Sequence, residues 1–197
     1  MDQGIDVQEC FKIIMKALRN ADKQIKKTMS PFETEANTPV LKKVEGIFNL
    51  DEKHIQYIVY KALIGMGKFP VYIEDPYGRG MSKYCDVTVY TPDWEKSLWI
   101  EIKTTGWCTE GEYSRCVKSD ARKLSTLTQK GAGRYLLVTS IEDGKQHKAE
   151  WEEWFEGLKG IKFAPNLFDS FASQKFKEGE KVVDGHYAVC LFQVETQ

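Results

Sequence analysis

The stretch of residues 84–105 constrains this chain most, because it contains two short runs with the alternation of β-strands. The first run is CDVTVY at residues 85–90, and the second is LWIEIKT at residues 98–104. Both are rich in β-branched and aromatic residues, and both alternate with a period of two. Residues 91–97, TPDWEKS, have the composition of a turn. The stretch therefore predicts a β-hairpin.

Alternation assigns the side chains of this hairpin to two faces. The apolar face is expected to be core and to hold Cys85, Val87, Val89, Leu98, Ile100 and Ile102. The opposite face then holds Asp86 on the first strand, and Glu101 and Lys103 on the second. Asp86 must lie opposite residue 101 or 103, because a slip of one residue would send it to the other face. The pattern therefore brings two carboxylates and an ammonium together at the open end of the hairpin.

This combination of groups has a chemical use. Two neighbouring carboxylates form an oxygen site for a hard cation such as Mg²⁺. A bound divalent cation can activate water and stabilise negative charge on a phosphate. A lysine on the same face can orient that water or stabilise the developing charge. An ordinary solvated sheet face also carries Glu and Lys two residues apart, so Glu-x-Lys alone leaves both interpretations open.

The order of these residues resembles the PD-(D/E)XK nuclease superfamily, which has the restriction-endonuclease-like fold. Its signature is an acidic residue early in one strand and Glu/Asp-x-Lys in the next, and Asp86, Glu101 and Lys103 match it. Cys85 stands where the name-giving proline would be. The family also tends to place a glutamate on the helix before the hairpin, and Glu52 matches that position. The resemblance covers the middle of the chain, from about residue 50 to about residue 140.

The resemblance implies an α/β domain with a mixed central β-sheet flanked by α-helices. It implies hydrolysis of phosphodiester bonds in nucleic acid, with DNA expected, and Mg²⁺ or Mn²⁺ as the cofactor. Asp86, Glu101 and the carbonyl of Ile102 would hold the metal, Lys103 would position the water, and Glu52 would assist. One alternative is a catalytically inactive domain of this fold that binds nucleic acid or a protein partner. Another is a small-molecule phosphohydrolase with an enclosed pocket.

Three cationic residues are candidates for contacts with substrate phosphate. Arg79 lies in the glycine-rich turn before the hairpin, and Lys83 lies between that turn and the first strand. Lys123 lies on a helix predicted over residues 112–130, where the superfamily often places a polar or basic residue. The alternative for Lys123 is a surface pair with Asp120 at the i,i+3 spacing. The alternative for Glu52 is a carboxylate favoured by the helix dipole alone.

The remaining elements are predicted from periodicity, caps and turn residues. Residues 1–39 are expected to form an amphipathic helix (5–27) and a loop (28–39), and residues 40–197 the nuclease-like domain, within one globular domain overall. The predicted helices are 40–48, 51–66 and 147–158, and the predicted strands are 69–74, a central strand at 134–140 and an edge strand at 187–194. Residues 160–182 are ambiguous. The basic face of helix 5–27 is either simply solvated or contacts phosphate or a second copy in a homodimer.

Composition narrows the class of protein. A chain of 197 residues is near the usual size of one domain. A net charge of −1 gives no overall nucleic-acid signature, so a DNA partner would need a local basic surface. The 5 cysteines include no C-x-x-C pair, which favours reduced thiols and a cytoplasmic location. We expect no signal peptide and no membrane-spanning segment.

Overall fold

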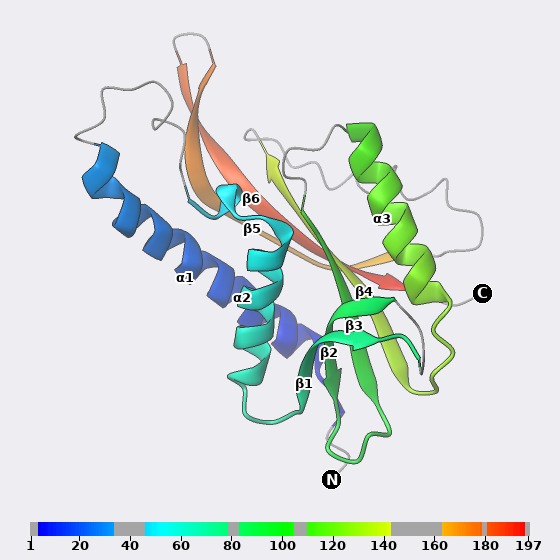
Figure 1. Cartoon of the computed structure of the whole chain (residues 1–197). Coiled ribbons are helices and arrows are strands. Elements are labelled where there is room, and N and C mark those ends of the chain that lie inside the picture. The colour runs from blue at the N-terminus through cyan, green and yellow to red at the C-terminus, as the bar shows by residue number, and fades with distance from the viewer. Residues whose placement is uncertain are drawn as a thin grey trace.

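The computed structural model describes residues 4–33, 46–78, 83–104, 110–142, 163–178 and 181–195. The helices in these ranges are α1 (Val7–Glu33), the 3-10 helix η2 (Gly46–Asn49), α2 (Glu52–Ile64) and α3 (Glu110–Ser125). The strands are β1 (Val71–Pro76), β2 (Tyr84–Tyr90), β3 (Ser97–Thr104), β4 (Ala132–Glu142), β5 (Phe163–Glu178) and β6 (Lys181–Val194). Figure 1 shows how these elements are arranged.

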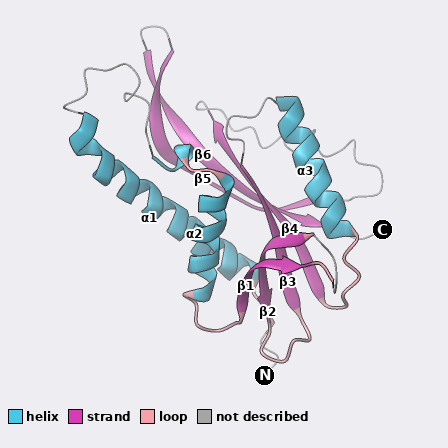
Figure 2. Cartoon of the chain, in the orientation of Figure 1, coloured by secondary structure: helices cyan, strands magenta, loops and turns pink. Residues whose placement is uncertain are grey.

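The strands form one sheet in the order β1-β2-β3-β4-β6-β5. β3 and β4 are parallel, and the other neighbouring strands are antiparallel. The predicted mixed α/β sheet is therefore confirmed. A parallel pair needs a crossover connection, and α3 lies in the segment between β3 and β4. In Figure 2, α1 and α2 lie to one side of the strands and α3 lies to the other.

Two apolar clusters fill the spaces between the sheet and the helices. The first joins α1 and α2 to the sheet, through residues such as Ile14, Val59 and Ile100. The second joins α3 to the opposite face, through residues such as Leu124 and Phe192. The clusters use alternate residues of the central strands, since Leu137 belongs to the first and Leu136 to the second. Period-two alternation in a sheet covered on both faces explains this division.

The two helices before the hairpin form largely where the sequence predicts them. Asp51 caps α2, because its Oδ1 accepts a hydrogen bond from the backbone N–H of His54 at 2.9 Å. Asp6 does the same for α1 with the backbone N–H of Gln8 at 2.9 Å. The predicted loop at 28–39 is wrong in its first part, because α1 continues to Glu33. The Ser30-Pro31 pair of this predicted loop lies in the last turn of α1.

The C-terminal strands differ most from the predictions. The ambiguous segment contains β5, which is 16 residues long and bears register shifts between Pro165 and Leu167 and between Ala172 and Gln174. Such bulges interrupt the alternation that identifies a strand in sequence. The predicted edge strand at 187–194 is the second half of β6, which lies between β4 and β5, so the edge prediction is wrong.

The remaining predictions of secondary structure have mixed outcomes. The central position of β4 is confirmed. β1 begins at Val71 rather than at residue 69, and α3 ends at Ser125 rather than at residue 130. The predicted helix at 147–158 lies outside the described residues, and so do residues 40–45 of the predicted helix at 40–48, whose last residues lie in η2. No helix in the described ranges is both long and apolar enough to cross a membrane.

Candidate functional site

The candidate site begins with the register between β2 and β3. The antiparallel pairs run from Tyr90↔Ser97 to Val87↔Ile100. The next position in this register sets Asp86 opposite Glu101, as the sequence analysis requires. Regular pairing stops before that position, since Val87↔Ile100 is the last β2–β3 pair. The two strands therefore part at the residues that carry the motif.

The side chain of Asp86 takes over the hydrogen bonding where the ladder ends. Its Oδ2 accepts from the backbone N–H of Ile102 at 2.8 Å. Its own backbone carbonyl accepts from Nε2 of Gln56 on α2 at 2.8 Å. Because the N–H and C=O of one strand residue point to the same neighbouring strand, the carbonyl of Ile102 also points toward Asp86. A carboxylate and a backbone carbonyl thus lie at the same gap in the sheet.

The backbone is irregular on the other side of Asp86 as well. The β1–β2 register would pair Glu74 with Asp86, but this pair is missing between Ile73↔Val87 and Asp75↔Cys85. Glu74 has a φ of 53°, a left-handed conformation that is uncommon for glutamate. Its carboxylate accepts a hydrogen bond from Lys53 on α2 at 2.5 Å. Asp86 is therefore placed by a local distortion of both ladders.

This distortion overturns one prediction about the hairpin faces. Cys85 packs in the second cluster with α3, whereas Val87 packs in the first. Its Sγ donates to the backbone carbonyl of Ile100 at 3.3 Å. The strict alternation that assigned Cys85 to the face of Val87 therefore fails between these two residues. The other five predicted core residues of the hairpin do belong to the first cluster.

Glu101 is the second carboxylate, and it is 3% exposed. The hydroxyl of Tyr77, just after β1, donates a hydrogen bond to Glu101 Oε1, and the Tyr77 ring packs against Trp99 with centroids 5.5 Å apart. Burial, followed by the charge of Asp86, raises the pKa of Glu101 to about 8. Burial also raises the pKa of Asp86. The hydrogen bond that Asp86 accepts from the Ile102 N–H and its hydrogen bond with Glu101 act in the opposite direction. The two carboxyl groups therefore titrate together, and near neutrality they retain a proton.

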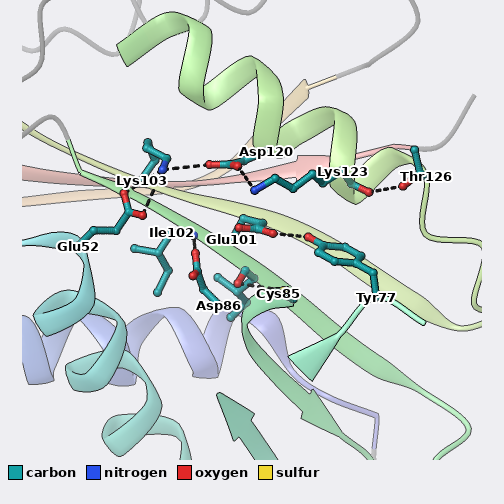
Figure 3. A network of polar contacts seen from close by, with 11 residues as sticks. Glu52, Tyr77, Cys85, Asp86, Glu101, Ile102, Lys103, Asp120, Lys123 and Thr126 are labelled. Atoms are coloured by element: carbon teal, nitrogen blue, oxygen red, sulfur yellow. Dashed lines mark hydrogen bonds and ion pairs between the residues drawn. The ribbon is translucent and has the colours of Figure 1, made fainter. Parts of the chain in front are cut away.

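Lys103 lies near the end of β3, where carboxylates from both flanking helices reach it. Its Nζ is 2.9 Å from Glu52 Oε2 on α2 and 3.2 Å from Asp120 Oδ2 on α3 (Figure 3). Burial opposes the charge of Lys103, but the carboxylates of Asp120 and Glu52 outweigh burial and raise its pKa. Lys103 is therefore an ammonium at neutral pH, and its position is fixed by two ion pairs.

Of the three residues predicted to contact the substrate, the structure places only Lys123 at the site within the described ranges. Lys123 lies at the site, where its Nζ is 2.5 Å from Asp120 Oδ1 and the charge of Glu101 contributes to raising its pKa. Lys83 has an exposed side chain, and its backbone carbonyl accepts from the N–H of Tyr77 at 3.1 Å. Arg79 lies outside the described residues.

The sequence analysis did not assign Tyr77 to the site, and it named Asp120 only as a surface partner of Lys123, a pair that the structure does contain. Tyr77 gave no signal beyond its place in a glycine-rich turn. Asp120 gave a partial one, because it flanks the apolar positions Val117, Ala121 and Leu124 of α3 closely enough to be buried, and it is 5% exposed. Acidic residues are seldom buried unless they are paired, and a surface pair does not require burial. A buried acidic residue three positions before a lysine therefore indicates an ion pair that faces the interior.

The oxygen atoms at the gap fit a hard divalent cation. Asp86 and Glu101 supply carboxylates and Ile102 supplies a carbonyl, and Mg²⁺ usually takes one or two carboxylates and keeps several waters. The raised pKa values of Asp86 and Glu101 come chiefly from burial, and the nearby charges of Lys53 and Lys123 offset it only in part. No cluster of three or more histidine, cysteine or acidic side chains that could hold a metal occurs in the part of the chain that the structure describes. Any cation here would therefore depend on the backbone carbonyl and on water.

Comparisons with protein-family models, curated proteins and solved structures found no match for this chain. The resemblance to the PD-(D/E)XK superfamily therefore rests on the order and arrangement of Asp86, Glu101 and Lys103, and it stays a prediction.

Proposed function

We propose that this chain is a metal-dependent nuclease of the restriction-endonuclease-like fold that hydrolyses phosphodiester bonds of nucleic acid, with DNA as the expected substrate. One observation carries the proposal: the buried Glu101 and the half-buried Asp86 form a carboxyl pair at a gap between two strands, and Lys103 lies two residues farther along β3. The pair lacks an ion-pair partner of its own among the described salt bridges, whereas Glu52 and Asp120 both have one.

The cofactor proposed for this site is Mg²⁺ or Mn²⁺. Asp86, Glu101 and the carbonyl of Ile102 would hold it. When bound, the cation would supply a Lewis acid that stabilises charge on a phosphate and lowers the pKa of water. The two carboxyl groups bind it fully only when both are ionised, so cation binding and proton release are linked at this pair.

The role proposed for Lys103 follows from its hydrogen bonds. An ammonium has three N–H donors, and Lys103 Nζ lies within 3.2 Å of three oxygens, two of Glu52 and one of Asp120. Because one carboxylate needs only one of these donors, Lys103 would turn another toward a water or a phosphate oxygen as negative charge develops. Glu52 assists by holding Lys103 directly, and Lys123 adds a second positive charge near Glu101 for contact with phosphate.

The burial of the carboxyl pair favours an enzyme over a catalytically inactive domain. A buried carboxyl group beside a second, half-buried one destabilises a fold, and a domain that only binds nucleic acid gains nothing from this pair. A small-molecule phosphohydrolase would be expected to hold its substrate in an enclosed pocket at these residues. A groove of about 370 Å³ lies between α1 and β5, lined by residues that include Phe11, Arg19 and Phe168, and none of the candidate site residues lines it.

The proposal is tested by cleavage assays on supercoiled plasmid, linear duplex and single strands, with Mg²⁺ or Mn²⁺. Lys103→Ala should lower the cleavage rate by about two to three orders of magnitude, which is typical of a preorganised electrostatic donor. Its affinity for nucleic acid should change little, because many dispersed contacts hold the phosphate backbone. Glu101→Ala should abolish both cation binding and cleavage.

Lys68→Ala is the matched control. Lys68 is exposed and is not a residue of the candidate site, and its Nζ lies 2.7 Å from Glu9 Oε1. It should cleave at the wild-type rate. If Lys103→Ala also cleaves at that rate, Lys103 has no catalytic role and the mechanism is wrong. If the wild type cleaves none of the substrates with either cation, the catalytically inactive domain is the better interpretation.

A further inference from the structure

Asp120 of α3 bridges two lysines, and its role is not part of the superfamily motif. Its Oδ2 lies 3.2 Å from the ammonium of Lys103, and its Oδ1 lies 2.5 Å from the ammonium of Lys123. Figure 3 shows Asp120 between the two lysines, with Glu101 close to Lys123. One carboxylate therefore connects β3 to α3 at the candidate site and joins its two ammonium groups.

The engagement of both oxygens argues for a role other than metal ligation. The side chain of Asp120 is only 7% exposed, and each of its oxygens already faces an ammonium. A cation bound by Asp120 would have to displace one of these lysines. Asp86 and Glu101, by contrast, have no lysine within ion-pair distance among the described salt bridges.

A bridging carboxylate solves an electrostatic problem. Two ammonium groups near one point repel each other, and an exposed lysine relieves the repulsion by turning toward water. The side chain of Lys123 is 31% exposed, so it could turn toward water in this way. The Asp120 carboxylate between the ammonium groups lowers their repulsion and supplies each with a hydrogen bond. Both lysines can then stay charged and close together.

We propose that Asp120 is a positioning residue, which holds the ammonium groups of Lys103 and Lys123 at a fixed separation so that both contact the same phosphate group of the substrate. The inference rests on the proposed nuclease function. Glu52 restrains Lys103 from the α2 side, and Asp120 restrains it from the α3 side. Lys123 has no such second restraint among the described ion pairs, so its position depends on Asp120.

The first test measures the lysines directly and needs no cleavage activity. Wild type, Asp120→Asn and Asp120→Glu are treated with an amine-acetylating reagent, and the rate at each lysine is followed by mass spectrometry. Asp120→Asn should raise the rate at Lys123 several-fold and the rate at Lys103 by less, because Glu52 still restrains Lys103. Asp120→Glu keeps the charge and should restore most of the protection.

The matched control is Asp169→Asn, which removes one carboxylate charge and one ion pair, the 2.6 Å contact with Arg19, on another part of the fold. It should leave the rates at Lys103 and Lys123 unchanged. If Asp120→Asn also leaves both rates unchanged, Asp120 does not hold the lysines and the proposal is overturned, whatever the protein cleaves. If the folded fraction of Asp120→Asn is too low, the rates of both proteins are measured with a stabilising osmolyte at which both are folded, and unchanged rates again overturn the proposal.

The second test is a double-mutant cycle on cleavage, with Asp120→Asn, Lys123→Ala and the double variant. Asp120→Asn should lower kcat by about tenfold to a hundredfold and change KM little, since a misplacement of about 1 Å costs up to about a hundredfold. In the Lys123→Ala background, the further loss should be much smaller, because Asp120 acts mainly through the lysine that has no other restraint. Losses that simply multiply would overturn the proposal. A wild type without cleavage would refute the nuclease function, while the acetylation result would still decide whether Asp120 anchors the lysines.

Discussion

Replacing Glu101 by glutamine should make the protein more stable at pH 8 than the wild type. Burial and the charge of Asp86 raise the pKa of Glu101 from an ordinary value of 4.5 to about 8 in the native state. Between these two values the native state holds a proton that the unfolded state has released. The stability that this proton contributes is complete below the unfolded value and is lost as the pH rises toward 8.

The magnitude follows from linkage. At about 1.4 kcal/mol for each pKa unit, the full loss from 4.5 to about 8 amounts to about 5 kcal/mol. The same relation gives a loss of about 1 kcal/mol at pH 5, about 3 at pH 7 and about 4 at pH 8. Glutamine cannot ionise, and its side-chain oxygen can still accept from the hydroxyl of Tyr77. The free energy of unfolding of Glu101→Gln should therefore exceed that of the wild type by an amount that grows with pH.

The assay is urea-induced unfolding of both proteins at pH 5, 6, 7 and 8 with a chelator present. The difference between the two proteins at each pH cancels the titration of groups that they share. Asp86 is coupled to Glu101, so the difference reports the pair. Glu95→Gln is the control, since Glu95 is an exposed carboxylate in the turn of the same hairpin and should give a difference near zero throughout. The reasoning is refuted if the Glu101→Gln difference is the same at pH 5 and pH 8.

Two further predictions concern the cation and Glu52. At pH 8, MgCl₂ at ten times its dissociation constant should stabilise the wild type by about 1.4 kcal/mol and raise its Tm. It should not stabilise Asp86→Asn. An equal rise of Tm in both proteins, measured by thermal shift, would exclude a metal site at Asp86. Glu52→Gln should keep this cation-dependent shift and lower the cleavage rate by less than Lys103→Ala does, because Asp120 still holds Lys103. A loss equal to that of Lys103→Ala would contradict the supporting role of Glu52.

The parts of the fold that sequence predicts well are those governed by local rules. The β2–β3 register follows from period-two alternation, and the start of α2 follows from Asp51 as its cap. The central position of β4 follows from its apolar composition. For the same reason, the meeting of Asp86 with Glu101 could be predicted, since it requires only the register of one hairpin.

The failures come from irregular backbone and from long-range packing. β5 carries two bulges, so its residues do not alternate over their full length. The pairing of β6 with both β4 and β5 depends on strands far apart in the chain. Asp120 reaches Lys103 only because α3 packs over β3, and the local pattern at residue 120 indicates no more than its burial and its pairing with Lys123. Glu52 and Lys123 were found through the resemblance to a family and not through periodicity.

The exceptions to local rules gather at one place in the sheet, and that concentration is itself an argument about function. At Asp86 the β2–β3 ladder ends and a side chain bonds the Ile102 N–H that a backbone carbonyl would otherwise bond. Opposite Asp86, Glu74 adopts a left-handed backbone conformation, and beside it Glu101 is buried with a raised pKa. Each exception lowers stability, and sequences normally keep such exceptions where chemistry needs them. A chain under no demand but folding would close the ladder with an apolar pair at positions 86 and 101. The two carboxyl groups at this gap, with Lys103 two residues farther along β3, are the reason that we propose a cation site here.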